Sequence, residues 1–261
     1  MTSNRQNMAT FLQTRLDTKF VGHTIHYYHS LASTMEAAKK AAGEGAAEGT
    51  VIIADEQTSG RGRQGRTWLS PKGSLAMSII LRPSVDNLPQ LVMIAALAVV
   101  RAIRKVAGLE AQIKWPNDVL IKGKKVCGIL IESEVKGDRV NAAIIGIGIN
   151  VNLNPLAFPE ISTLATSLSH ELGKEIPRDK IAGILLCELE QLYLEAQAGA
   201  PIHEEWRAHM ETLGKSIQVR TGQSVEQGEA EAVTENGNLI LRRADGSFAE
   251  ILAGDVTVVK D

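Results

Sequence analysis

The sequence predicts an α+β fold with a largely antiparallel mixed sheet, flanking helices and a small C-terminal β-barrel. Between residues 113 and 152, strand-like runs follow one another with turns of only a few residues, which is typical of antiparallel pairing. Helical periodicity is confined to a few longer segments outside this region. After residue 214 the chain holds only short strands and Gly-rich turns. We therefore expect one domain over residues 1–213 and a second over 214–261.

The composition of the chain limits its class. The 261 residues have a formal net charge of −2, are 44% hydrophobic and are 22% charged, which is ordinary for a globular protein. No basic excess points to DNA, and Cys127 and Cys187 are too far apart for a metal knuckle or a disulfide framework. Neither a signal peptide nor a membrane-spanning run is visible. We therefore expect a cytoplasmic protein without a membrane or DNA partner.

The N-terminal part alternates between strands and a helix. A strand is predicted over residues 20–28 and a second over 50–55. Between them, Ser33 and Glu36 form a capping box that predicts a helix over 34–42. The hydroxyl of Ser33 could serve only as the helix cap or could also bind a polar ligand at the helix N-terminus, and both interpretations stay open.

The most distinctive segment reads Gly60-Arg61-Gly62-Arg63-Gln64-Gly65-Arg66-Thr67-Trp68. Glycine allows a ligand to approach the backbone closely, and arginine offers a fork of donors suited to phosphate or carboxylate. Three like charges repel one another and the glycines resist a fixed conformation. We therefore expect a mobile anion-binding loop that nothing in the ligand-free protein holds in place.

The glycine spacing of this loop also fits a dinucleotide-binding motif. That motif requires a helix at the loop and an acidic residue about 20 positions further on. Here a turn-rich segment and a predicted strand over residues 74–81 follow, and residues 79–82 contain no acid. A P-loop fails as well, because no Gly-Lys-Ser/Thr follows at the required spacing.

The middle of the chain combines a core helix with irregular strands. A helix over residues 86–107, capped by Asp86 or Asn87, has apolar side chains at helical spacing. Pro116 then interrupts a strand-like run and predicts an edge, a bulge or a bend. The elements predicted after it are strands over 119–122, 125–135 and 140–152, helices over 163–172, from Pro177 and over 202–213, and terminal strands over 216–220, 229–233, 239–242, 248–252 and 256–259.

Four motifs in this order resemble the bacterial biotin–protein ligases. They are the loop at residues 60–68, Lys114-Trp115-Pro116-Asn117-Asp118, Lys125-x-x-Gly128-Ile129-Leu130-x-Glu132 and Gly148-Ile149-Asn150. The resemblance implies a catalytic domain similar to class II aminoacyl-tRNA synthetases and an SH3-like C-terminal domain. It also implies activation of biotin by Mg-ATP to biotinoyl-5′-AMP, followed by transfer to a lysine of a biotin carboxyl carrier protein.

The resemblance implies roles for individual residues of this sequence. Biotin binding is implied for Ser33, Thr34, Gln57, Gly60, Arg61, Gly62, Arg63, Trp68, Lys125, Gly128, Leu130, Gly146 and Gly148. Nucleotide binding is implied for Arg61, Arg63, Lys114, Asn117 and Asn150, and a place near the metal for Asp118. Catalytic charge stabilisation is implied for Arg61, Arg63, Lys114 and Lys125, whereas Arg66 is expected only to anchor the loop.

Two departures from the family pattern affect these expectations. Met35 stands where the repressor-type member has Asn, so a polar contact is in doubt there. Only about 25 residues precede the first matching motif, so we expect a ligase without operator binding, and a homodimer is possible. A lipoate- or octanoyl-transferring ligase and a non-enzymatic ligand sensor remain as alternatives.

Overall fold

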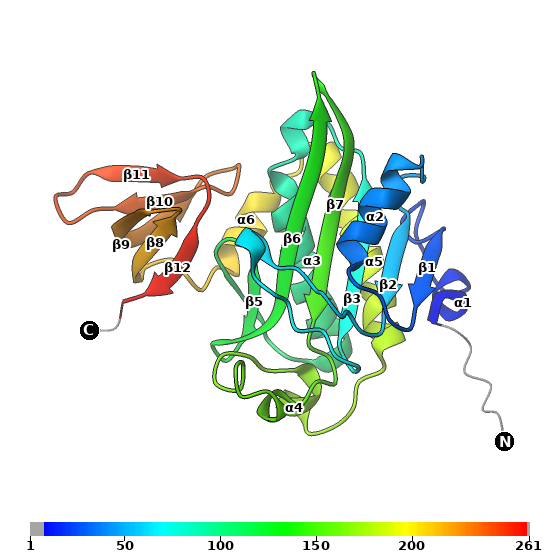
Figure 1. Cartoon of the computed structure of the whole chain (residues 1–261). Coiled ribbons are helices and arrows are strands. Elements are labelled where there is room, and N and C mark those ends of the chain that lie inside the picture. Colours follow the sequence, from blue (N-terminus) through cyan, green and yellow to red (C-terminus); the bar gives the residue numbers. More distant parts are fainter. Residues whose placement is uncertain (1–7, 260–261) are drawn as a thin grey trace.

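The computed structural model describes residues 8–259, which form two β-sheets with helices packed around the larger one (Figure 1). The larger sheet contains seven strands in the order β1-β2-β3-β7-β6-β5-β4. Strands β1 and β2 pair in parallel, and the other neighbours pair antiparallel. The prediction of a largely antiparallel mixed sheet is therefore confirmed.

The predicted elements of the larger unit keep their order, with shifts at their ends, and the structure adds a short helix over residues 8–13 that was not predicted. Its strands are β1 (Ile25–Tyr28), β2 (Val51–Ala54), β3 (Leu75–Leu81), β4 (Gln112–Lys114), β5 (Asp118–Ile121), β6 (Lys124–Lys136) and β7 (Arg139–Ile149). Its helices are α1 (Met8–Gln13), α2 (Thr34–Gly43), α3 (Gln90–Ala107), α4 (Leu168–Leu172), α5 (Arg178–Gln197) and α6 (Ile202–Ala208). Asp86 and Asn87 do not cap α3, because they belong to a separate 3₁₀ turn.

Side chains that alternate along the central strands explain why both faces of the sheet are covered. The odd-numbered residues of β7 from 143 to 149 belong to the large core, which also contains the buried face of α3 and of α5. Ala142 and Ile144 belong instead to a small core with Met35 and Ala38 of α2. Because successive strand residues point to opposite faces, Gly146 and Gly148 lie on the α2 face. This face is where a cavity is found.

The C-terminal strands form a second, smaller sheet at one end of the molecule (Figure 1). They are β8 (Ser216–Thr221), β9 (Ser224–Val233), β10 (Leu239–Arg242), β11 (Phe248–Ile251) and β12 (Asp255–Val258), and all pair antiparallel. The order is β11-β10-β9-β8-β12. Strands β11 and β12 are the two edges of this small antiparallel sheet, and among the described residues they do not pair with each other. The predicted small C-terminal β-domain is therefore present.

The irregular segment around Pro116 connects the two sheets. Residues 115–117 form a turn between β4 and β5, so the predicted bend is present. The Trp115–Pro116 peptide bond is cis. The indole Nε1 of Trp115 donates to the carbonyl oxygen of Gly237 at 2.9 Å, and its backbone nitrogen donates to Thr212 Oγ1 at 3.0 Å. Within residues 8–259, no helix has both the length and the apolar character required to cross a membrane.

Candidate active site

A cavity lies on the α2 face of the sheet, above β6 and β7 and below the loop that follows β2. It encloses about 750 Å³ of empty space, part of which is open to solvent. The lining residues are Thr34, Met35, Gln57, Arg61, Gly62, Arg63, Arg66, Thr67, Trp68, Met77, Asn117, Asp118, Lys125, Gly128, Ile129, Leu130, Gly146, Ile147, Gly148 and Asp255.

Glycines of β6 and β7 let the side chain of a tryptophan pack directly against the sheet. A Cβ at Gly148 would overlap the indole ring of Trp68, and one at Gly128 would lie 3.0 Å from its Cζ3. The indole of Trp68 thus fills the space above the sheet where these glycines carry no side chain. The backbone nitrogen of Trp68 donates to the carbonyl of Gly60 at 2.9 Å, which holds the ring in this position.

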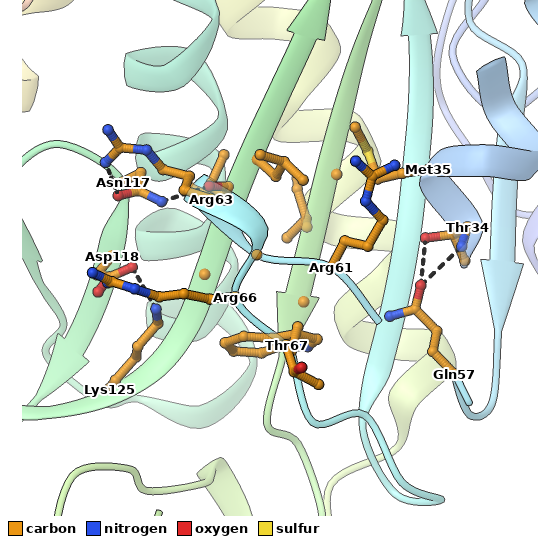
Figure 2. Close-up of a pocket in the computed structure, with 18 of the residues that line it drawn as sticks. Thr34, Met35, Gln57, Arg61, Arg63, Arg66, Thr67, Asn117, Asp118 and Lys125 are labelled. Carbon is orange, nitrogen blue, oxygen red and sulfur yellow. Dashed lines mark hydrogen bonds and ion pairs between the residues drawn. The ribbon is translucent and has the colours of Figure 1, made fainter. Parts of the chain in front are cut away.

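Basic side chains gather at one end of the cavity (Figure 2). Lys125 Nζ lies 2.7 Å from Asp118 Oδ1 and 5.3 Å from the ring centroid of Trp68. Arg63 Nη1 donates to Asn117 Oδ1 at 2.9 Å, and the amide of Asn117 in turn donates to a backbone carbonyl of β6. A planar guanidinium and an ammonium held in one cavity can bind carboxylate or phosphate oxygens.

The opposite end of the cavity carries a small polar network. The backbone nitrogen and the Oγ1 of Thr34 both donate to Gln57 Oε1, at 2.8 and 3.1 Å. Ser78 Oγ donates to Thr34 Oγ1 at 2.9 Å. The predicted capping bond of Ser33 is absent: its backbone is extended, as a cap requires, but its buried Oγ has no hydrogen-bond partner among residues 8–259. The capping box fails because Glu36 pairs with Arg61 instead.

Each arginine of the loop has a partner, so the expectation that nothing holds this segment is wrong. Arg61 pairs with Glu36 of α2 and lies 3.7 Å from a carboxylate oxygen of Glu132 on β6. Arg63 also donates to the carbonyl of Gly254 at 3.3 Å, and Arg66 pairs with Asp255. Inside the loop, the nitrogen of Gly62 donates to the carbonyl of Arg66 at 2.7 Å. The acceptors of the arginine side chains are far away in sequence, which is why the motif alone did not reveal them.

The structure brings most of the predicted site residues into this one cavity. Four of them do not line it: Ser33, Gly60, Lys114 and Asn150. Asn150 is buried and its side chain donates to the carbonyl of Thr166 at 3.0 Å, so in this structure it supports the chain leading into α4. The lining residues without a predicted role in binding are Met35, Arg66, Thr67, Met77, Ile129, Ile147 and Asp255. No motif in the sequence marked Asp255 as a site residue, because it lies in the C-terminal sheet and the four motifs all precede residue 151.

The cavity offers few groups for holding a metal through the protein alone. Within residues 8–259, no cluster of three or more His, Cys, Asp or Glu side chains has a metal-binding arrangement. Asp118 contributes a carboxylate close to the basic end. This donor set suits Mg²⁺ that arrives with phosphates, because Mg²⁺ keeps several waters and needs only one or two carboxylates. Burial raises the pKa of Cys127, beneath this wall, well above its usual range, so its thiol stays protonated.

Two family models match the chain over both of its sheets. Residues 27–150 match the biotin/lipoate A/B protein ligase family, and residues 212–259 match the biotin protein ligase C terminal domain. A bifunctional ligase/repressor BirA of Bacillus subtilis is 41% identical over 248 residues, which cover 92% of this chain and 76% of that protein. The chain belongs to the biotin protein ligase family.

Two further members of the biotin protein ligase family extend this result. The biotin–[acetyl-CoA-carboxylase] ligase of Paracoccus denitrificans is 38% identical and matches 75% of this chain and 85% of its own length. The structure of the biotin protein ligase of Aquifex aeolicus in complex with biotin and ATP matches with a TM-score of 0.78 and 30% identity. It covers 91% of this chain and 99% of the other.

Proposed function

We propose that this protein binds biotin and ATP in the cavity between α2 and the loop over residues 60–68, which we call the arginine loop. The protein is an ATP-dependent biotin protein ligase, which activates biotin to biotinoyl-5′-AMP and transfers the acyl group to a protein. The observation that carries the site assignment is the placement of Arg63, Arg66 and Lys125 at one end of the cavity. The hydroxyl and amide of Thr34 and Gln57 lie at the other end and suit a neutral polar head group.

The first step joins two anions, and the basic end of the cavity is suited to it. A carboxylate oxygen of biotin attacks the α-phosphorus of ATP, the bond to the β-phosphate oxygen breaks, and pyrophosphate leaves. Lys125 and Arg63 oppose the charge that accumulates on the phosphorane oxygens, as preorganised donors do in a water-poor site. Asp118 would hold the Mg²⁺ that accompanies ATP, and the ion would supply further charge neutralisation.

The second step needs no nucleophile from the enzyme. The neutral ε-amine of an acceptor lysine attacks the acyl carbon of the anhydride, and AMP leaves with the electrons of the broken carbon–oxygen bond. The nitrogen releases one proton to water as the amide forms. The loop over residues 60–66 shields the anhydride from water until that lysine arrives. The acceptor is a biotin carboxyl carrier domain, whose exposed lysine must reach the basic end of the cavity.

Transfer of labelled biotin tests this function. With ATP and a biotin carboxyl carrier domain, label should move from biotin to the carrier, and label from lipoate should not. Transfer from lipoate but not from biotin would reject the biotin assignment in favour of a lipoate or octanoyl ligase. Formation of biotinyl hydroxamate from biotin, ATP and hydroxylamine would exclude a sensor without enzymatic activity. If biotin gave neither product, the proposal would be wrong.

Further properties of the protein remain proposals with their own measurements. We infer two units that meet at residues 213 and 214, and limited proteolysis should release a stable larger fragment near this boundary. The absence of operator binding stays a prediction, which a gel mobility shift with the promoter DNA of biotin genes checks. Light scattering with and without biotin and ATP determines whether a homodimer forms.

A further inference from the structure

Met35 closes one end of the cavity by packing directly onto the backbone of β7. It is the second residue of α2 and is only 4% exposed. A Cβ built at Gly146 would lie 2.5 Å from its Sδ and 3.1 Å from its Cγ. The thioether therefore occupies the space that any larger residue at position 146 would need. Both Met35 and Gly146 line the cavity, next to Leu130.

The backbone at Met35 is held in place by its neighbours on both sides. Thr34, which precedes it, has its backbone nitrogen and its hydroxyl bonded to Gln57, and it also accepts from Ser78. Behind Met35, the small apolar core contains Ala38 of α2 and Ile144 of β7. The start of the helix is thereby held, whereas the unbranched Met side chain keeps rotational freedom of its own.

We propose that Met35, seated on Gly146, sets the size limit of the acid that this end of the cavity accepts. The side chain presents methylene groups and sulfur to a ligand, with no strong hydrogen-bond donor. It therefore selects by shape, while the adjacent Thr34 and Gln57 select by hydrogen bonding. This inference rests on the proposed function, because it takes the biotin ring system to be the part of the ligand at this end.

The contact with Gly146 makes a double-mutant cycle possible. In Gly146→Ala the new methyl group must displace the thioether of Met35, and the space open to the thioether is the cavity. We expect this change to raise the Kd of biotin by about 10-fold or more. In the Met35→Ala background the obstacle is gone, so the same glycine replacement should raise the Kd by less than about 3-fold. Calorimetric titration of the four proteins with biotin measures both effects without requiring turnover.

A ligand with one extra group tests the size limit itself. The probes are biotin and its two N-methyl derivatives at the ureido nitrogens, with ATP and hydroxylamine to trap the adenylate. One methyl group in a tight pocket changes kcat/KM by about 10- to 200-fold. We expect Met35→Ala to raise the ratio of kcat/KM for one N-methylbiotin over biotin by at least about 10-fold. Met35→Leu, of similar volume, should keep the ratio of the unmodified protein.

The outcomes separate this proposal from the proposed function. If the unmodified protein forms no hydroxamate from biotin, the function itself is wrong. A second outcome is that biotin is activated while Gly146→Ala raises the Kd of biotin by the same factor in the unmodified protein and in the Met35→Ala background. In that case Met35 does not occupy the space that a side chain at position 146 needs. An unchanged selectivity ratio in Met35→Ala, including no activity with either methylated probe, overturns the size limit. The melting temperature of each variant reports whether it folds.

Discussion

Lys125 combines three features that suit it to stabilise a developing negative charge. It lines the cavity, it is paired with Asp118, and its ammonium lies over the face of Trp68. These contacts hold the charge in place before any ligand arrives, so little reorganisation is needed during the reaction. Because of these contacts, we expect Lys125→Ala to slow the formation of biotinyl-5′-AMP.

The variant Lys125→Ala should lower kcat for biotinyl-5′-AMP formation by on the order of 10²–10³-fold, as removal of one preorganised donor does. Pyrophosphate exchange in the presence of biotin measures this step alone. The matched control is Lys124→Ala, because Lys124 is exposed and does not line the cavity. A loss of less than 3-fold in Lys125→Ala would remove this residue from the chemistry.

A cluster of Tyr27, Asp55 and Arg178 at the end of β2 makes the free energy of unfolding depend on pH. Burial and a hydrogen bond to Asp55 raise the pKa of Tyr27 to about 12. Burial alone would raise the pKa of Asp55. The bond from Tyr27 and the Arg178 guanidinium, 2.7 Å away, outweigh burial and hold the pKa of Asp55 below its usual value. A carboxyl with a lowered folded-state pKa stabilises the fold above its unfolded pKa of about 3.9. This stability is lost as the pH falls through the lower folded-state value.

We therefore expect Asp55→Asn to lower the melting temperature at pH 7 by roughly 5 °C. The difference from the unmodified protein should shrink as the pH is lowered below about 4. Differential scanning calorimetry between pH 3 and 8 measures both. Asp138→Asn, in the exposed turn between β6 and β7, should leave the curve unchanged. A deficit that stays constant down to pH 3 would contradict the assigned ionisation.

At the scale of elements, the arginine loop is held on two sides by groups from different parts of the chain. Glu36 and Glu132 hold Arg61 from α2 and β6, and Asp255 holds Arg66 from β12. Arg61 remains 46% exposed, so each of its pairs is worth only about 0.2–1 kcal/mol. Such anchors can keep the loop near the cavity and still release it when a ligand enters or leaves.

The double variant Glu36→Gln/Glu132→Gln should speed tryptic cleavage within residues 60–66 by about 3-fold without ligand, because two weak anchors are lost. Biotin and ATP together should protect the loop in both proteins. Glu134→Gln is the control, since Glu134 lies on the same strand and contacts only Asn141 among the described side-chain hydrogen bonds. Equal cleavage of the loop with and without both ligands would show that the ligands do not order it.

The sequence predicted elements and motifs better than the contacts between them. Hydrophobic periodicity located α3, and hairpin turns located β6 and β7, because both signals are local. The pairing of Arg61 with Glu36 was not predictable, because the same Glu36 also fits a capping box. For the cavity, the resemblance supplied Thr34, Gln57 and Lys125. It could not supply Asp255, which reaches the site only through the placement of the second sheet.

At the scale of the whole molecule, the C-terminal sheet contributes to the wall of the cavity. Gly254 and Asp255 precede and begin β12, and they contact Arg63 and Arg66 of the loop. A second connection runs from Trp115 to Gly237. The smaller sheet is thus joined to the larger one at the arginine loop and beside the irregular segment between β4 and β5.

We expect Asp255→Asn to lower kcat/KM for biotin activation by about 2- to 5-fold, because the exposed Arg66 loses its ion-pair partner, whose side chain is 23% exposed. The loss should diminish at high salt, where this pair is screened in the unmodified protein as well. Asp245→Asn changes the same charge in an exposed turn of the same sheet and should have no effect. An equal loss at low and high salt would reject the electrostatic explanation.

The indole of Trp68, which packs on the glycines of β6 and β7, also provides an intrinsic fluorescence signal for ligand binding. Trp115 and Trp206 are buried in the core, at 2% and 0% exposure, whereas Trp68 lines the cavity. Occupation of the cavity should therefore change the emission of one tryptophan and leave the other two constant. Titration with biotin should shift the fluorescence of the unmodified protein, and the shift should vanish in Trp68→Phe. The remaining signal should then report only on unfolding of the core.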